Sequence, residues 1–198
     1  MLRRSKAGAI AARYWRGAKQ ECRGTSAIEF AIILPLMLTA YLGAVEVGNM
    51  LTLNRRTDQV AYTVADLTAQ VRTLSNAQIK NITDAATAIL TPYSTKDLSI
   101  VLTSVVADDK NRPKVAWSCS NGNGAPLAKN SSVDLPEGLT APGSSVIMAD
   151  VQYAYVPLFG EDAPFLGSTF GKFTMSRKFY SRPRRSATVD KTDNGCPG

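Results

Sequence analysis

The chain has 198 residues, of which 44% are hydrophobic, which is enough for one domain with a modest core but not for two independent domains. Its formal net charge is +7, but residues 1–24 hold seven basic side chains and one acid, so the rest, with 16 basic and 15 acidic residues, is nearly neutral. A basic excess confined to a short tail beside an apolar run indicates membrane orientation rather than nucleic-acid binding. The absence of histidine excludes the usual general base, Ser-His and Cys-His nucleophiles and the commonest metal ligand.

The first element expected along the chain is an apolar helix over residues 27–47. At 1.5 Å per residue this helix would span about 31 Å, close to the hydrocarbon thickness of a bilayer. Sixteen uncharged residues separate Glu29 from Glu46, and a membrane helix tolerates Pro35 within the run. Because the basic residues precede the run, we expect a single membrane span with a cytoplasmic N-terminus. A cleaved secretory signal and a buried core helix are the weaker alternatives.

Beyond the apolar run, helical periodicity continues as an apolar stripe with one polar interruption. Its members are spaced alternately four and three residues apart: Leu53, Thr57, Val60, Val64, Leu67, Val71 and Leu74. The stripe predicts that one helix runs from about residue 26 to 74. We expect it to seat the rest of the domain, and along a long helix it could also contact other copies in an assembly.

The remaining elements predict an α+β fold. Ser75 followed by Gln78 is a capping-box pattern, so a second helix is expected over residues 76–90. Segments rich in β-branched and aromatic residues predict four strands, separated by polar turns and a loop at 120–132. The strands are expected over residues 98–106, 114–118, 145–156 and 172–180. Two helices followed by about four strands with short connections predict an antiparallel sheet packed on the helix stem.

These elements divide the chain into a basic cytoplasmic leader (1–24), a transmembrane helix (25–48) and an extracytoplasmic α+β domain (49–198). Cys119 and Cys196 fall in this last part, whereas Cys22 lies in the leader. In an oxidising compartment the two late cysteines can form a disulfide, which could stabilise the domain by about 4 kcal/mol. Two unpaired thiols are the alternative.

The most informative residues lie where the basic tail meets the apolar run, in the sequence Arg23-Gly24-Thr25-Ser26-Ala27-Ile28-Glu29-Phe30. This junction resembles the type IV prepilin signal, in which a basic leader and a Gly precede the cut, and a Glu is the fifth residue of the mature chain. The aromatic residue after the Glu is similar to the tight-adherence (Tad, Flp-type) pilus branch. Residues 23–50 closely resemble the N-terminus of TadE-like pilus assembly proteins, or pseudopilins, and weaker similarity in element order and in the late cysteine pair extends over the rest.

The resemblance implies a minor pilin or pseudopilin of a Tad-type pilus assembly system, with a structural or assembly-priming role. A prepilin peptidase would cut between Gly24 and Thr25, which makes Glu29 and Phe30 mature residues five and six. An ionised carboxylate near hydrocarbon costs roughly 2–3 kcal/mol or more. Glu29 would offset this cost by pairing with the new ammonium group of Thr25, one helical turn away, or with that of an adjacent subunit.

The resemblance also implies partners and a location. The partners would be other pilin or pseudopilin subunits, the pilus assembly platform, the prepilin peptidase and inner-membrane lipid, but no nucleic acid. The protein would cross the bacterial inner membrane once and hold its C-terminal domain in the periplasm or outside the cell. The main alternative is an uncleaved single-pass envelope protein that acts as a scaffold or adhesin.

No pattern in the sequence indicates catalysis, a metal or a cofactor, so we expect a protein that is not an enzyme. The carboxylate pairs Asp108-Asp109 and Glu161-Asp162 fall in expected turns, where solvated residues are far commoner than catalysts. Residues 190–195 lack the alternate oxygen ligands and final Glu of a calcium loop. The basic cluster at 182–185 is expected to be a solvated strand end, and contact with anionic lipid or surface polysaccharide is the alternative.

Overall fold

A computed structural model describes residues 24–157 and 172–197, which fall into two compact units that divide between Val47 and Gly48. The basic leader before Gly24 and the acidic pair Glu161-Asp162 lie outside the described residues. A single 45-residue helix, α2 (Thr25–Ala69), contributes to both units. The long N-terminal helix expected from the apolar run is therefore confirmed.

The first unit consists, among its described residues, of the N-terminal part of α2. Its large apolar side chains are mostly exposed: Ile28 is 64% exposed, and Ile32 and Leu36 are each 72% exposed. Pro35 lies inside the helix, where its ring removes one backbone donor. Residues 30–41 of α2 therefore present a continuous exposed apolar surface, apart from the hydroxyl groups of Thr39 and Tyr41.

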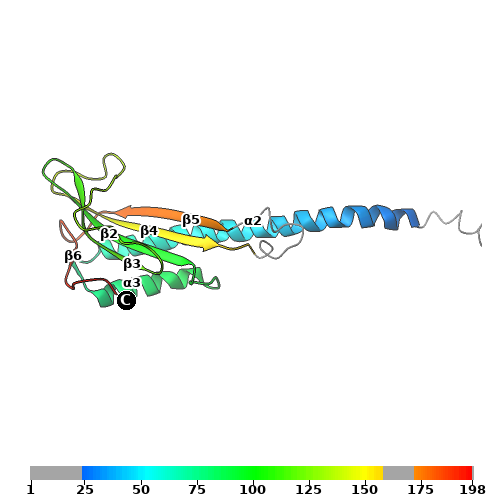
Figure 1. Cartoon of the computed structure of the whole chain (residues 1–198), viewed down its shortest axis with the longest axis horizontal. Coiled ribbons are helices and arrows are strands. Elements are labelled where there is room, and N and C mark those ends of the chain that lie inside the picture. Colours follow the sequence, from blue (N-terminus) through cyan, green and yellow to red (C-terminus); the bar gives the residue numbers. More distant parts are fainter. Residues whose placement is uncertain (1–23, 158–171, 198) are drawn as a thin grey trace, which may run out of the picture. The chain divides into compact units, whose positions relative to one another are not determined.

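The second unit contains the remaining elements. They are, in chain order, β1 (Thr73–Leu74), α3 (Asn76–Thr87), the 3-10 turn η2 (Ala88–Leu90), β2 (Leu98–Ala107), β3 (Pro113–Asn121), β4 (Ser145–Tyr155), β5 (Phe173–Ser181) and β6 (Asp190–Lys191). Strands β2 to β5 form an antiparallel sheet in the order β3-β2-β4-β5 (Figure 1). This arrangement confirms the predicted α+β class and the four-stranded antiparallel sheet.

One face of this sheet carries the core of the second unit. Alternate residues along β2 and β4 lie on this face, because successive side chains of a strand point to opposite sides. Its buried members include Ile100, Leu102, Ala149 and Val151. The stripe residues Leu53, Val60 and Val64 of α2 are fully buried in the same cluster. Within this unit the helix stripe therefore seats the sheet, as the sequence predicts.

The opposite face of the sheet is more polar. It carries Thr103, Asp150 and Gln152, and Lys178 forms a 3.5 Å ion pair with the Asp150 carboxylate across β4 and β5. The loop after β3 approaches this face closely at Gly124, where an added Cβ would lie 2.5 Å from the Ser99 hydroxyl oxygen. A residue without a side chain is therefore needed for the loop to lie this close to the sheet.

Helix α3 begins as the sequence predicts. The Ser75 hydroxyl accepts a hydrogen bond from the backbone N–H of Gln78, and the Gln78 side chain accepts one from the backbone N–H of Ser75. This reciprocal pair is the expected capping box, and it satisfies two donors that a helix start leaves without partners.

Helix α2 ends at Ala69, earlier than the end near residue 74 that the stripe predicts. The reason is a pairing with the C-terminal part of the chain: β1 and β6 form a parallel pair that aligns Thr73 with Asp190 and Leu74 with Lys191. The backbone N–H of Arg184 also donates to the carbonyl of Ala69 at 2.9 Å. Residues far away along the chain therefore form hydrogen bonds with the backbone groups that would otherwise form the last turns of a longer helix.

Candidate processing and assembly segment

The two residues of the expected cleavage site lie at the start of α2. Thr25 is the first residue of the helix, and Gly24 directly precedes it. Both residues are exposed, and a Cβ added to Gly24 would meet no atom within 4 Å. The Gly24–Thr25 peptide bond is therefore uncovered by the described part of the chain, and a second protein could reach it.

Glu29 and Phe30 follow in the next turn of the same helix. Both side chains are exposed, and Phe30 is 60% exposed. Glu29 is the one side chain of residues 24–45 that carries a charge at neutral pH. Glu29 follows Thr25 at the i,i+4 spacing, so the two side chains lie on the same side of the helix.

The helix around these residues has the properties of a membrane span. It includes an 18-residue window that is long and apolar enough to cross a bilayer, and none of that window is buried. The Thr39 hydroxyl donates to the carbonyl of Pro35 at 2.7 Å, so this polar group is satisfied within the helix. Among residues 24–157 and 172–197 this is the one helix of that kind, and its place near the N-terminus indicates single-pass membrane anchoring.

Comparison with protein-family models adds an independent observation to this geometry. Residues 24–66 match the TadE-like protein family. The TadE-like segment begins at Gly24 and lies almost wholly within α2. Comparison with curated proteins and with solved structures found no match. This segment of the chain is therefore similar to TadE-like proteins.

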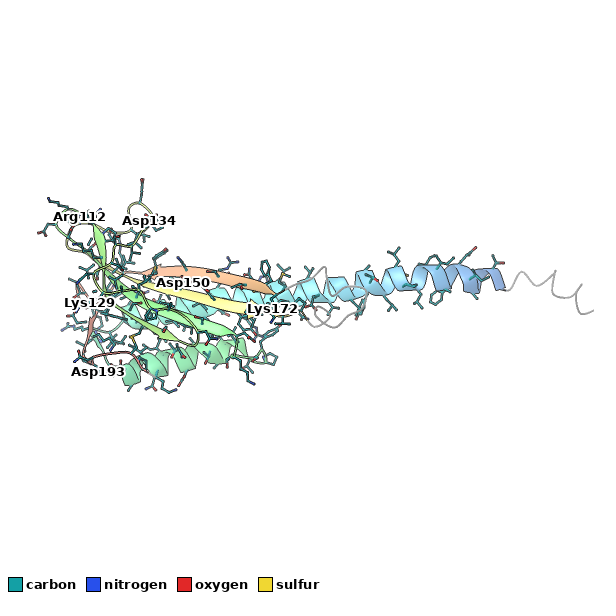
Figure 2. The ribbon with its side chains drawn as sticks, in the orientation of Figure 1. Arg112, Lys129, Asp134, Asp150, Lys172 and Asp193 are labelled. Carbon is teal, nitrogen blue, oxygen red and sulfur yellow. A yellow bond between two sulfur atoms is a disulfide. The ribbon has the colours of Figure 1, made fainter. Side chains whose placement is uncertain are left out.

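Outside the TadE-like segment, Asp108 is a turn residue, as expected. Its carboxylate accepts hydrogen bonds from the backbone N–H groups of Lys110 and Arg112 and from the Arg112 guanidinium, at 2.8–3.0 Å. Figure 2 labels Arg112 at this turn between β2 and β3. The hydrogen bonds from Arg112, first its backbone and then its side chain, lower the pKa of Asp108 below its usual value. Asp108 therefore stabilises a turn and has the partners of a structural residue.

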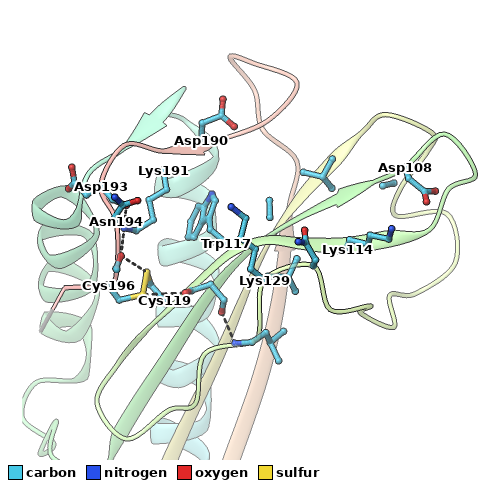
Figure 3. A pocket seen from close by; sticks show the side chains of 18 residues that line it. Asp108, Lys114, Trp117, Cys119, Lys129, Asp190, Lys191, Asp193, Asn194 and Cys196 are labelled. Carbon is cyan, nitrogen blue, oxygen red and sulfur yellow. Dashed lines mark hydrogen bonds between the residues drawn. A yellow bond between two sulfur atoms is a disulfide. The ribbon is translucent and has the colours of Figure 1, made fainter.

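The segment from Asp190 to Gly195 is likewise occupied by structural contacts. The Lys191 ammonium group donates to the carbonyls of Asp193 and Gly195, as the dashed lines in Figure 3 indicate. The Asp193 carboxylate accepts a hydrogen bond from the backbone N–H of Asn76. These contacts attach residues 190–196, here called the C-terminal strap, to the start of α3.

The basic cluster at residues 182–185 follows the end of β5, and its three arginines are exposed, as expected of a solvated strand end, but two of them also have distant partners. Arg182 donates to the backbone carbonyls of Gly138 and Leu139, and Arg184 forms an ion pair with Asp66 of α2. No local pattern in the sequence indicates these contacts, because each partner lies more than forty residues away along the chain.

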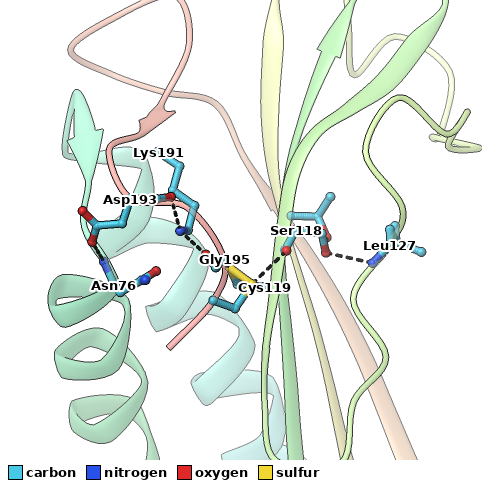
Figure 4. Close-up of a disulfide and its surroundings, with 9 residues drawn as sticks. Asn76, Ser118, Cys119, Leu127, Lys191, Asp193 and Gly195 are labelled. Atoms are coloured by element: carbon cyan, nitrogen blue, oxygen red, sulfur yellow. Dashed lines mark hydrogen bonds between the residues drawn. A yellow bond between two sulfur atoms is a disulfide. The ribbon is translucent and has the colours of Figure 1, made fainter. Parts of the chain in front are cut away.

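Cys119 and Cys196 are joined by a disulfide in the structure, with their Cα atoms 5.3 Å apart (Figure 4). The bond attaches the end of the strap to β3, beside the carbonyl of Ser118. The two cysteines are 77 positions apart in the sequence. The bond therefore connects β3 to a distant C-terminal segment, which also contains β6, the strand that pairs with β1.

Proposed function

We propose that this chain is a minor pilin or pseudopilin of a Tad-type pilus assembly system, cut by a prepilin peptidase between Gly24 and Thr25. The observation that carries the proposal is that two boundaries in the sequence coincide where an unbroken helix follows. The family match begins at Gly24, directly after the basic tail ends at Arg23, and the chain is helical from Thr25 to Ala69. A cut at this position would remove the tail and leave the whole helix on the mature chain.

Glu29 provides a physical reason for the proposed cut. A carboxylate in hydrocarbon is unfavourable by roughly 2–3 kcal/mol or more when it has no partner. Cleavage creates an ammonium group on Thr25, either in the same chain or in an adjacent subunit, and this group can neutralise Glu29. The carboxylate also lies near the positive end of the helix dipole. Glu29 would thus penalise an isolated subunit in lipid and favour a docked one.

The same proposal assigns a location and partners. The N-terminal tail would lie in the cytoplasm, because basic residues are retained there. The second unit would lie in the periplasm or outside the cell, and its disulfide supports an oxidising compartment. The exposed apolar face of α2 would contact the helices of other pilin subunits, the assembly platform and inner-membrane lipid. The second unit would cap, prime or decorate the fibre.

The test is the N-terminal residue of the protein isolated from cells with and without a functional prepilin peptidase. Mass spectrometry should find a chain that begins at Thr25 only where the peptidase is active. Gly24→Val should block the cut, whereas Gly43→Val, at a second glycine with no atom within 4 Å of an added Cβ, should leave it intact. Retention of residues 1–24 in peptidase-positive cells would instead favour an uncleaved envelope protein.

A further inference from the structure

A hollow of about 790 Å³ lies in the second unit, between β3, the loop that follows it and the C-terminal strap. Its volume is in the range of sites that bind small ligands, about 300–1,000 Å³. Figure 3 views it from close by and labels Trp117, Lys129 and Asp190 among the residues that line it. The hollow is open to solvent, since Lys129, Asn130 and Asn194 on its walls are exposed.

Trp117 supplies a fixed aromatic surface in this hollow. Its indole N–H donates to the carbonyl of Val189 at 2.7 Å, and Val189 is buried at 1% exposure. The ring is half-buried and contacts the core, so it loses little further freedom when a ligand covers it. A rigid ring of this kind suits the flat C–H face of another ring.

Some charged side chains of the hollow already have hydrogen-bond or ion-pair partners within the protein, whereas others have none among the described residues. Lys191 donates to two carbonyls, Asp193 accepts from Asn76, and Asp108 pairs with Arg112. By contrast, the ammonium groups of Lys114 and Lys129 have no hydrogen bond or ion pair with any described residue. Asp190 accepts one hydrogen bond from the Thr188 hydroxyl through one of its two carboxylate oxygens. The free groups are therefore two ammonium groups and one carboxylate oxygen, beside the amides of Asn130 and Asn194.

We propose that this hollow binds an acidic saccharide, that is, a sugar chain with carboxylate groups. The Trp117 ring would stack on the C–H face of one sugar ring. Lys129 and Lys114 would each bind a carboxylate of the sugar chain through charge-assisted hydrogen bonds, which are about twice as strong as neutral ones. The free oxygen of Asp190 would accept hydrogen bonds from sugar hydroxyls, and the two asparagine amides would both donate and accept them.

The main alternative fits the hollow less well. An acidic peptide would satisfy the lysines but has no flat, hydroxyl-bearing ring for Trp117 and the asparagines. The proposal does not depend on the pilus assignment, because it concerns residues outside the family match.

The test uses the full chain in detergent micelles with the substitution Trp15→Phe. The chain has two tryptophans, so this variant leaves Trp117 as its one tryptophan and its fluorescence reports on the hollow. The probes are a galacturonic acid trimer, the neutral galactose trimer and an aspartate hexapeptide. We expect the acidic trimer to change the fluorescence saturably and to bind roughly tenfold more tightly than the other two.

Two lysine substitutions then localise the binding. Lys129→Gln should weaken binding of the acidic trimer roughly tenfold, because it removes one charge-assisted hydrogen bond. Lys110→Gln, at an exposed lysine that does not line the hollow, should leave binding unchanged. Equal binding of the two trimers, equal binding of the peptide, equal effects of the two substitutions or no saturable signal would each overturn the proposal.

Discussion

The side-chain carboxylate of Asp193 accepts a 2.6 Å hydrogen bond from the backbone N–H of Asn76, the first residue of α3. The two residues are 117 positions apart in the sequence. Ser75 satisfies the N–H of Gln78 in the same turn, so the start of α3 is capped both by its own neighbour and by the C-terminal strap. The strap is therefore part of the folded unit and stabilises a helix far from it in sequence.

Asp193→Ala should lower the free energy of unfolding by about 1 kcal/mol, the usual effect of removing a helix cap. Chemical denaturation of the full chain in micelles, followed by circular dichroism, measures this. Asp109→Ala is the matched control, because Asp109 is an exposed aspartate in a turn. Equal stability of the two variants would show that the cap contributes nothing.

Replacing both Cys119 and Cys196 by Ser should lower the free energy of unfolding by up to about 4 kcal/mol, because the unfolded chain regains the freedom of a long loop. Denaturation under non-reducing conditions compares the variant with the wild type. Cys22→Ser should have no effect, since Cys22 is not part of this pair. A double variant as stable as the wild type would contradict the prediction.

Asp108→Asn should destabilise the chain near neutral pH but much less in acid. The folded-state pKa of Asp108 is lowered, mainly by hydrogen bonds from Arg112, so the ionised carboxylate favours folding. This contribution is fully present above the usual aspartate pKa and is lost as the pH falls through the lowered one. Denaturation midpoints measured across the acidic range should therefore converge for variant and wild type. A difference that stays constant with pH would contradict the assignment.

Glu29→Ala should leave membrane insertion intact and reduce assembly roughly tenfold or more, because the docked subunit would lose the proposed ion pair in lipid. Resistance of the protein to carbonate extraction measures insertion, and the amount of the protein recovered with partner pilins measures assembly. Ser26→Ala, an exposed position in the same turn, should change neither. Undiminished assembly of the Glu29→Ala variant would exclude the proposed pairing.

Features that depend on neighbours along the chain could be predicted from the amino-acid sequence. The apolar run predicts the long helix, the Ser75–Gln78 pair predicts the start of α3, and the choice of residue types predicts β2 and β4 to within about one residue at each end. Such signals are local, because helix caps and strand periodicity involve residues only a few positions apart. The roles of Gly24 and Glu29 also depend on a local pattern, and they stay predictions.

The end of α2 and the role of the C-terminal part of the chain depend instead on contacts between distant residues. Leu74 continues the helical stripe, yet it lies in β1 because Lys191 is its strand partner. The hollow beside Trp117 likewise combines β3 with a strap that follows it by about seventy residues. Hydrogen bonds between such distant residues leave no local pattern in the sequence, since each partner is compatible with several conformations until the fold brings the two together.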